Sequence, residues 1–98
     1  MKILALEMEN STNGKKEIQP FLKEEAQTVW RLTQAGQVRE IYFDAERHTA
    51  VIVLEAEGKS EAEKIFGELP LAREGFIRFE IIPLAPYDGY TKLFNYDG

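Results

Sequence analysis

The sequence predicts an α+β domain whose elements follow one another as strand, helix, strand, strand, helix and strand. Two stretches carry apolar residues at helical spacing and end near Gly36 and Pro70. Four shorter stretches are rich in β-branched and aromatic residues and are separated by turn-forming residues. The chain has 98 residues, which is room for one hydrophobic core, so residues 1–98 are predicted to form a single domain.

Composition restricts the classes of function. The chain is 44% hydrophobic and 30% charged, as expected for an ordered globular protein. Its net charge of −5 disfavours a nucleic-acid partner, and no apolar run approaches the roughly 20 residues of a membrane span. The first ten residues resemble the start of a signal peptide, but Glu7 and Glu9 interrupt the apolar run and predict a strand instead. The absence of cysteine excludes disulfides and fits a cytoplasmic location.

The first half of the chain contains a strand, a loop and a long helix. Residues 2–9 are apolar on both sides, which predicts a strand covered on both faces. The polar residues 10–18 predict a loop, and Pro20 suits the first turn of a helix. That helix carries an apolar stripe formed by Leu22, Ala26, Val29 and Thr33, with Trp30 at its flank. Gly36 is expected to end it.

The second half contains a hairpin, a second helix and a last strand. Strands are predicted over residues 37–44 and 49–55, joined by a polar turn at 45–48. Ser60 and Glu63 have the spacing of a capping box, and the helix that they begin is expected to end at Pro70. The last strand is predicted over residues 76–82.

This order is the ferredoxin-like β-α-β-β-α-β arrangement, a four-stranded antiparallel sheet with strand order 4-1-3-2 and both helices on one face. The side chains predicted to face the helices are Leu4, Leu6, Ile41, Phe43, Val51, Val53, Ile77, Phe79 and Ile81. The opposite face is then predicted to carry Ile3, Ala5, Val38, Tyr42, Ile52, Leu54 and Ile82, with Glu7, Glu40, Arg78 and Glu80 among them. So many apolar groups call for a cover, and a second copy of the chain is the expected partner. Residues 86–98, rich in aromatic groups, are predicted to be an arm that reaches that partner.

These features resemble the muconolactone isomerase-like family of dimeric α+β barrel proteins. The matching segments are TQAGQVREIYF, the hairpin, SEAEKIFGELPL, FIRFEIIPL and the tail APYDGYTKLF. The resemblance implies a homodimer in which two sheets pack face to face, with a tail that reaches the other copy. It also implies a small-molecule ligand, bound between a sheet and its own helices or near the barrel mouth. Relatives include lactone isomerases, cofactor-free monooxygenases and haem-degrading enzymes, and the fold alone does not choose among them.

The predicted catalytic residues are Glu7, Tyr42, Arg78 and Glu80, as proton-transfer and anion-positioning groups on the barrel-facing side. The alternative for the same residues is an ion-pair network at a dimer interface. No cofactor is expected and no metal site, because the only histidine, His48, lies in a predicted turn and the His-Asp pair of YCII-type relatives is missing.

Two classes of function follow. The first is a small enzyme of the muconolactone isomerase type, acting on a lactone-type substrate by proton transfer. The second is a non-catalytic module, either a binding or accessory protein for a small ligand or a structural unit of an assembly. A pocket sealed by Trp30 would argue against an enzyme and a binder alike, whereas an open cavity lined by two carboxylates would favour the enzyme.

Overall fold

A computed structural model of the chain describes residues 1–10 and 17–94. The strands of its sheet are β1 (Lys2–Glu9), β2 (Val38–Phe43), β3 (Ala50–Glu55) and β4 (Ile77–Pro83). Its α-helices are α1 (Leu22–Gln34), α2 (Lys59–Gly67) and α3 (Pro70–Arg73). Short 3-10 helices span Gln19–Phe21 and Gly89–Leu93. Most of the loop predicted over residues 10–18 lies outside the described residues.

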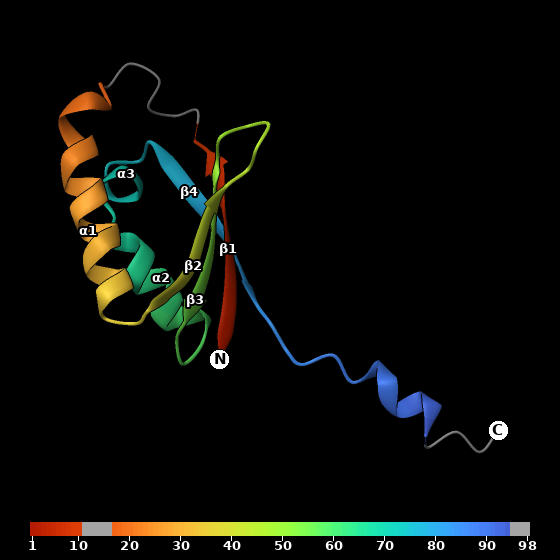
Figure 1. Cartoon of the computed structure of the whole chain (residues 1–98). Coiled ribbons are helices and arrows are strands. Elements are labelled where there is room, and N and C mark those ends of the chain that lie inside the picture. The colour runs from red at the N-terminus through yellow and green to blue at the C-terminus, as the bar shows by residue number, and fades with distance from the viewer. Residues whose placement is uncertain (11–16, 95–98) are drawn as a thin grey trace.

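The four strands form one antiparallel sheet in the order β2-β3-β1-β4. All three α-helices lie against the same face of this sheet, and no described helix covers the other face (Figure 1). The order is the predicted one, with the last strand beside the first. The α+β, ferredoxin-like fold class is therefore confirmed.

The end of α1 is fixed by a glycine, as the sequence predicts. Gly36 has a φ of +81°, a conformation that is costly for any residue with a Cβ atom. The N–H of Gly36 donates to the carbonyl of Thr33, and the N–H of Gln37 donates to the carbonyl of Leu32. These two bonds form a Schellman motif, which satisfies carbonyls that the last helical turn would otherwise leave free.

The second helical region differs from the prediction in two ways. No side chain caps α2: it begins after Gly58, so the predicted capping box of Ser60 and Glu63 is wrong because the helix already includes Lys59. Pro70 does not end a continuous helix either. α2 ends at Gly67, and Pro70 occupies the first turn of α3, where its missing N–H costs nothing.

The predicted orientation of β1 and β3 is wrong. Ile3 and Leu54 are fully buried against the helices, whereas the register pairs Leu4 with Val53 on the opposite face. The prediction fails because β1 is apolar on both sides, and a slip of one residue then reverses every side chain without changing the pattern. For β4, the assignment of Phe79 and Ile81 to the helix side is confirmed, since both pack against the core.

A β-bulge explains why β2 does not alternate evenly. Val38 lies opposite Leu54, and Glu40 lies opposite Val53, so Arg39 is the extra residue between them. The bulge brings Val38 into the core on the same side as Ile41. The prediction placed Val38 with Tyr42 on the other face, and the inserted residue is the reason for that error.

The core lies between the helices and the two central strands. Its buried members are Ile3, Ala5, Leu32, Val38, Ile52, Leu54, Ala56, Ala62, Ile65, Phe66 and Leu69. The ring of Phe66 on α2 stacks on that of Phe79 on β4, with 4.5 Å between ring centroids. These contacts tie α2 to an edge strand as well as to the sheet centre.

The face of the sheet without helices, called the open face from here on, is apolar at its centre and polar at its edges. The register places there the half-buried residues Leu4, Leu6, Met8, Val51, Val53 and Ile82. The edge strands add the exposed groups Glu40, Tyr42, Arg78 and Glu80. An apolar centre with a charged rim is the composition of a surface that a partner covers.

The C-terminal tail, residues 84–94, extends away from the domain (Figure 1). The N–H of Leu84 donates to the carbonyl of Lys2, and beyond it the aromatic side chains are solvent-exposed, reaching 82% for Phe94. The rings of Tyr87 and Tyr90 meet edge to face, with centroids 4.9 Å apart. The radius of gyration is 16.6 Å, against roughly 13 Å for a compact domain of this size.

Candidate active site

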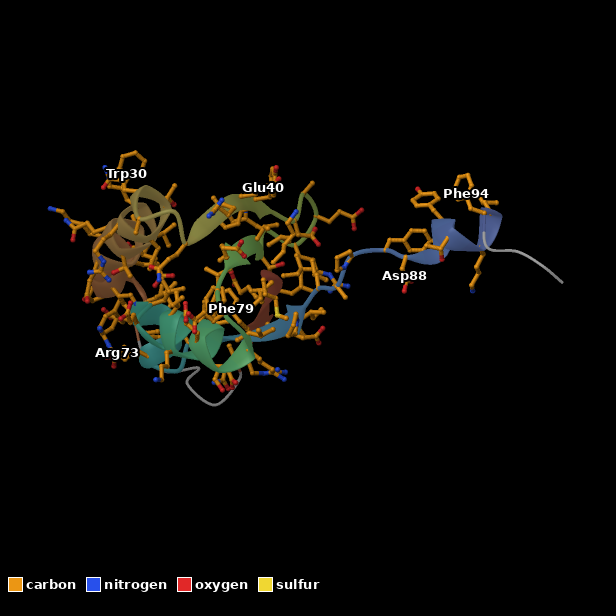
Figure 2. The ribbon with its side chains drawn as sticks, turned by 90° about the horizontal axis from the view of Figure 1, so that it is seen from below. Trp30, Glu40, Arg73, Phe79, Asp88 and Phe94 are labelled. Atoms are coloured by element: carbon orange, nitrogen blue, oxygen red, sulfur yellow. The ribbon has the colours of Figure 1, made fainter. Side chains whose placement is uncertain are left out.

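An open groove of about 660 Å³ lies between α1 and the helix-facing side of the sheet. Its walls are mainly apolar and aromatic, and come from both central strands and both edge strands as well as from α1. Figure 2 shows Trp30 on the outer side of α1 and Phe79 nearer the middle of the domain. Trp30 is 62% exposed, so it does not seal the groove. A concave, apolar surface with few polar groups is the usual form of a small-molecule site.

Glu7 reaches this groove from the end of β1. Its Oε1 accepts a hydrogen bond of 2.9 Å from the backbone N–H of Ala50, at the start of β3. The ladder between β1 and β3 ends at the pair Leu6 and Val51, so the Glu7 side chain extends the contact between the two strands by one step. This bond fixes the carboxylate in place and occupies one of its two oxygen atoms.

Glu25 enters the same groove from α1. Its Oε1 accepts a hydrogen bond of 3.0 Å from the backbone N–H of Leu71, which lies in the first turn of α3. Burial raises the pKa of the Glu25 carboxyl, the hydrogen bond from Leu71 opposes that effect, and the negative charge of Glu7 raises the pKa further. Glu25 is therefore a carboxyl group that holds its proton more tightly than an ordinary glutamate.

The positive charge of Arg73 lowers the pKa of Glu25, but its guanidinium group is paired with other carboxylates. Arg73 lies 3.2 Å from a carboxylate oxygen of Glu24 and 3.2 Å from one of Glu74. No lysine, arginine or histidine is among the described residues that line the groove. The two carboxylates thus face an apolar space that holds no basic partner from the described part of the chain.

The structure divides the predicted catalytic residues between two faces of the sheet. Glu7 was expected on the barrel-facing side and instead lies in the groove, because β1 turns the opposite side to the helices from the one predicted. Tyr42 lies on the open face, as predicted, and also borders the groove. Its hydroxyl donates to Oε1 of Glu40 at 2.7 Å, which raises the pKa of Tyr42. Arg78 and Glu80 are exposed on the open face, opposite Met8 and Leu6. They do not meet Glu7.

Sequence reasoning missed Glu25, although its position carries a signal. It lies three residues after Leu22 and four before Val29, inside the apolar stripe of α1. An acidic residue within such a stripe must be buried with a partner or must line a cavity, because an unpaired charge in a core is costly. Here it has a partner, the N–H of Leu71, and it also lines a cavity.

The other aromatic side chains and the histidine have simpler roles. Phe66 is a core residue, and Phe21 packs against Phe76 with 5.6 Å between ring centroids. His48 lies in the turn between β2 and β3 with a φ of 58°, and its ring stacks on Phe43. Among residues 1–10 and 17–94, no three histidine, aspartate or glutamate side chains gather as a metal site would require. No described helix is long and apolar enough to cross a membrane.

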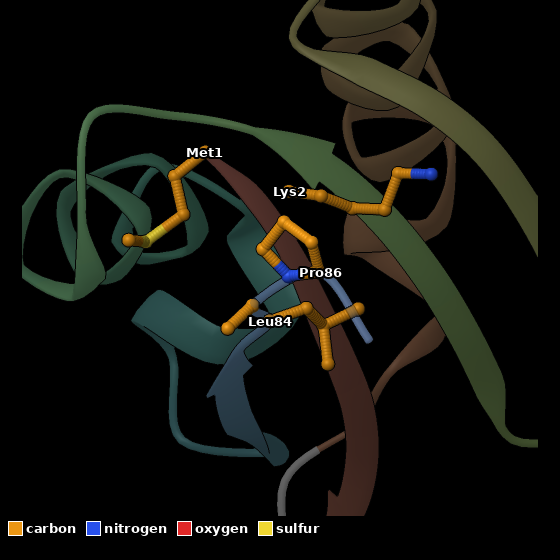
Figure 3. A pocket seen from close by; sticks show the side chains of 5 residues that line it. Met1, Lys2, Leu84 and Pro86 are labelled. Carbon is orange, nitrogen blue, oxygen red and sulfur yellow. The ribbon is translucent and has the colours of Figure 1, made fainter. Parts of the chain in front are cut away.

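A second hollow lies where the tail leaves the sheet (Figure 3). It has a volume of about 570 Å³ and is lined by Met1, Lys2, Leu84, Ala85 and Pro86. No carboxylate is in this lining, so it offers no group for proton transfer. The groove under α1 remains the better candidate for chemistry.

No family model and no curated protein sequence matches the chain. A search of solved structures finds a crystal structure of muconolactone isomerase, with a TM-score of 0.73. The superposition covers 90% of this chain and 92% of that one. The chain has the fold of muconolactone isomerase. The family resemblance of the sequence segments is thus confirmed as a shared fold, and at 14% identity the likeness extends to the fold alone.

Proposed function

We propose that the protein is a small isomerase that binds a lactone-type organic molecule in the groove under α1 and moves a proton within it. One observation carries this proposal: Glu25, whose pKa is raised by burial, opens with Glu7 onto an apolar groove that is accessible from solvent. An acid or base is most effective when its pKa lies near the working pH, so a raised carboxyl pKa favours proton transfer. The fold shared with an isomerase is consistent with this assignment.

The reaction needs no cofactor. A carboxylate takes a proton from the carbon beside the lactone carbonyl, and the electrons of the broken C–H bond form the C=C bond of an enolate. The carboxyl group then returns the proton to the far carbon of the conjugated system, which shifts the double bond. Glu25 is the proton carrier in this scheme, because the ionised Glu7 beside it disfavours a second negative charge.

The proposal is tested with α-angelica lactone, a small unsaturated lactone without a charged group. Its isomerisation to the conjugated form changes the ultraviolet absorbance, and in deuterium oxide the transferred position gains deuterium. The chain is expected to accelerate the reaction over buffer, and Glu25→Gln is expected to lower the rate at least about tenfold, the low end of a general acid–base contribution. Glu63→Gln, an exposed position on α2 outside the groove lining, is the matched control.

Two outcomes would change the assignment. Binding without turnover, seen as a raised melting temperature but no isotope incorporation, would favour the non-catalytic ligand-binding protein. No binding and no turnover across a panel of unsaturated lactones would reject the groove as their site.

We also propose that a second copy of the chain covers the open face. Its apolar centre, with Leu6 and Val53 among its members, runs across three neighbouring strands, and a continuous apolar patch of this kind often marks an interaction surface. In this arrangement Arg78 and Glu80 belong to the interface, as an ion-pair network, rather than to catalysis. The tail, residues 86–98 of the sequence, supplies a further contact to the partner copy, in which the exposed rings of Tyr87, Tyr90 and Phe94 take part.

The dimer is tested by light scattering at micromolar concentration. A mass of 11.3 kDa, that of one chain, would rule it out. Leu6→Lys is expected to dissociate the dimer, because it places a charge at the centre of the interface. Removal of residues 86–98 is expected to weaken association, and an unchanged dimer after that truncation would show that the tail does not reach the partner.

A further inference from the structure

We infer that the groove under α1 accepts molecules that carry no negative charge and rejects their anionic analogues. The inference rests on the proposed function, in that it takes this groove as the ligand site. It is carried by the arrangement of charges around the groove, which is independent of any reaction that occurs there.

The described lining of the groove contains two carboxylates and no basic side chain. Glu7 and Glu25 approach from β1 and α1, and each uses one oxygen to accept a backbone N–H. A ligand carboxylate in the groove would therefore face at least one negative charge without a positive group in the lining. Arg73, whose charge acts on Glu25, is outside the described lining and lies in contact with Glu24 and Glu74.

The apolar walls of the groove and the net charge of the chain further disfavour an anionic ligand. The groove walls are apolar, so water screens charges less there than at an open surface. The whole chain carries a net charge of −5, which repels anions before they reach the groove. An uncharged molecule meets neither penalty, and it gains from contact with the aliphatic and aromatic walls.

The raised pKa of Glu25 is a further reason to expect an uncharged ligand. Since burial and the charge of Glu7 raise the pKa of Glu25, its carboxyl group favours the protonated form relative to an ordinary glutamate. In its protonated form Glu25 can donate a hydrogen bond to a lactone, ketone or ester oxygen, and in its ionised form it is the base of the proposed reaction. The ligand class is therefore a small, uncharged molecule with an apolar skeleton and a carbonyl group.

The experiment compares three saturated lactones, which cannot isomerise, so that turnover does not disturb the measurement. They are γ-valerolactone, the same ring with a carboxymethyl group in place of the methyl group, and the methyl ester of that acid. The ester is larger than the acid but uncharged, so it separates charge from size. Binding is followed by the fluorescence of Trp30, the only tryptophan, which lies at the groove rim.

The ester is expected to bind at least about tenfold more tightly than the acid at neutral pH, a factor that a single unscreened charge pair readily supplies. In the double variant Glu7→Gln with Glu25→Gln this ratio is expected to fall to about threefold or less. Circular dichroism checks that the variant is folded. Glu63→Gln, which removes an exposed charge on α2 outside the groove lining, is expected to keep the wild-type ratio.

The outcomes distinguish the inference from the function on which it rests. If the acid binds as tightly as the ester or more tightly, the charge inference is overturned, while the groove remains a ligand site. If none of the three lactones binds, the proposed ligand site itself is rejected, and the charge inference with it. A ratio that persists in the double variant would also overturn the inference, because the two carboxylates would not be its cause.

Discussion

Replacement of Glu25 by glutamine is expected to make the protein more stable at neutral pH. In the folded chain, burial and the charge of Glu7 raise the pKa of the Glu25 carboxyl, so its ionised form is disfavoured there. A group with a raised folded pKa contributes its full stability below the unfolded pKa, about 4.3 for glutamate, and loses it as the pH rises through the folded value. Glutamine carries no charge, and its side-chain oxygen can still accept the N–H of Leu71.

The expected gain is about 1 kcal/mol at pH 7, within the range of about 0.5–2 kcal/mol that removal of an unfavourable charge commonly gives. For a domain of this size, that gain raises the melting temperature by roughly 4–8 °C. At pH 3 the wild-type carboxyl is protonated as well, so the gain should vanish. The assay is thermal unfolding at fixed protein concentration between pH 3 and pH 8.

Two further variants separate charge from hydrogen bonding. Glu25→Ala also removes the charge but leaves the N–H of Leu71 in the first turn of α3 without its side-chain acceptor. It is expected to be less stable than Glu25→Gln by about 1–3 kcal/mol at every pH. Two results would refute the argument that burial disfavours the ionised Glu25 carboxyl. One is a Glu25→Gln protein less stable than wild type at pH 7, and the other is a gain in unfolding free energy that does not change with pH.

Three other predictions concern the fold. Gly36→Ala is expected to lower the free energy of unfolding in urea by about 1–2 kcal/mol because of its φ of +81°. Gly67→Ala, in the last turn of α2 with open space where the new Cβ would lie, should raise it by about 0.5–1 kcal/mol. Equal effects of the two variants would disprove the backbone explanation. Leu54→Ala, at a fully buried site, should cost about 2–5 kcal/mol by the same method, and a loss below 1 kcal/mol would contradict its place in the core. Val53→Ala, on the open face, should weaken dimerisation in dilution experiments more than it changes the circular dichroism spectrum of the folded chain, and an unaltered dissociation constant would argue against an interface there.

Glu7 and Glu25 have a proposed role in catalysis and an observed role in holding the fold together. Glu7 links β1 to β3, and Glu25 links α1 to α3, so both would be retained for folding even without a reaction. The isotope-exchange test distinguishes these roles, because a purely structural carboxylate leaves no deuterium in a substrate. The charge preference of the groove is a separate property, since it depends only on where the carboxylates lie.

The strands, the helices and their order could be predicted from the sequence, except for the break between α2 and α3. The stripe of α1, the hairpin and the last strand each have a local period, and Gly36 and Pro70 mark boundaries through the φ values that they favour. The handedness of the crossovers then leaves few possible topologies, and the observed strand order is the expected one. Each of these inferences depends on residues that are close together along the chain.

The tertiary structure alone decided which side of β1 and β3 faces the helices, and hence which carboxylates share the groove. Leu4 and Ile3 are equally suited to a core, so the alternation could not choose between them, and the choice followed from docking against α1 and α2. The partners of Glu7 and Glu25 are 43 and 46 residues away, at positions that no local pattern links. The candidate site therefore exists only once the helices have packed on the sheet, because packing brings these distant groups to one surface.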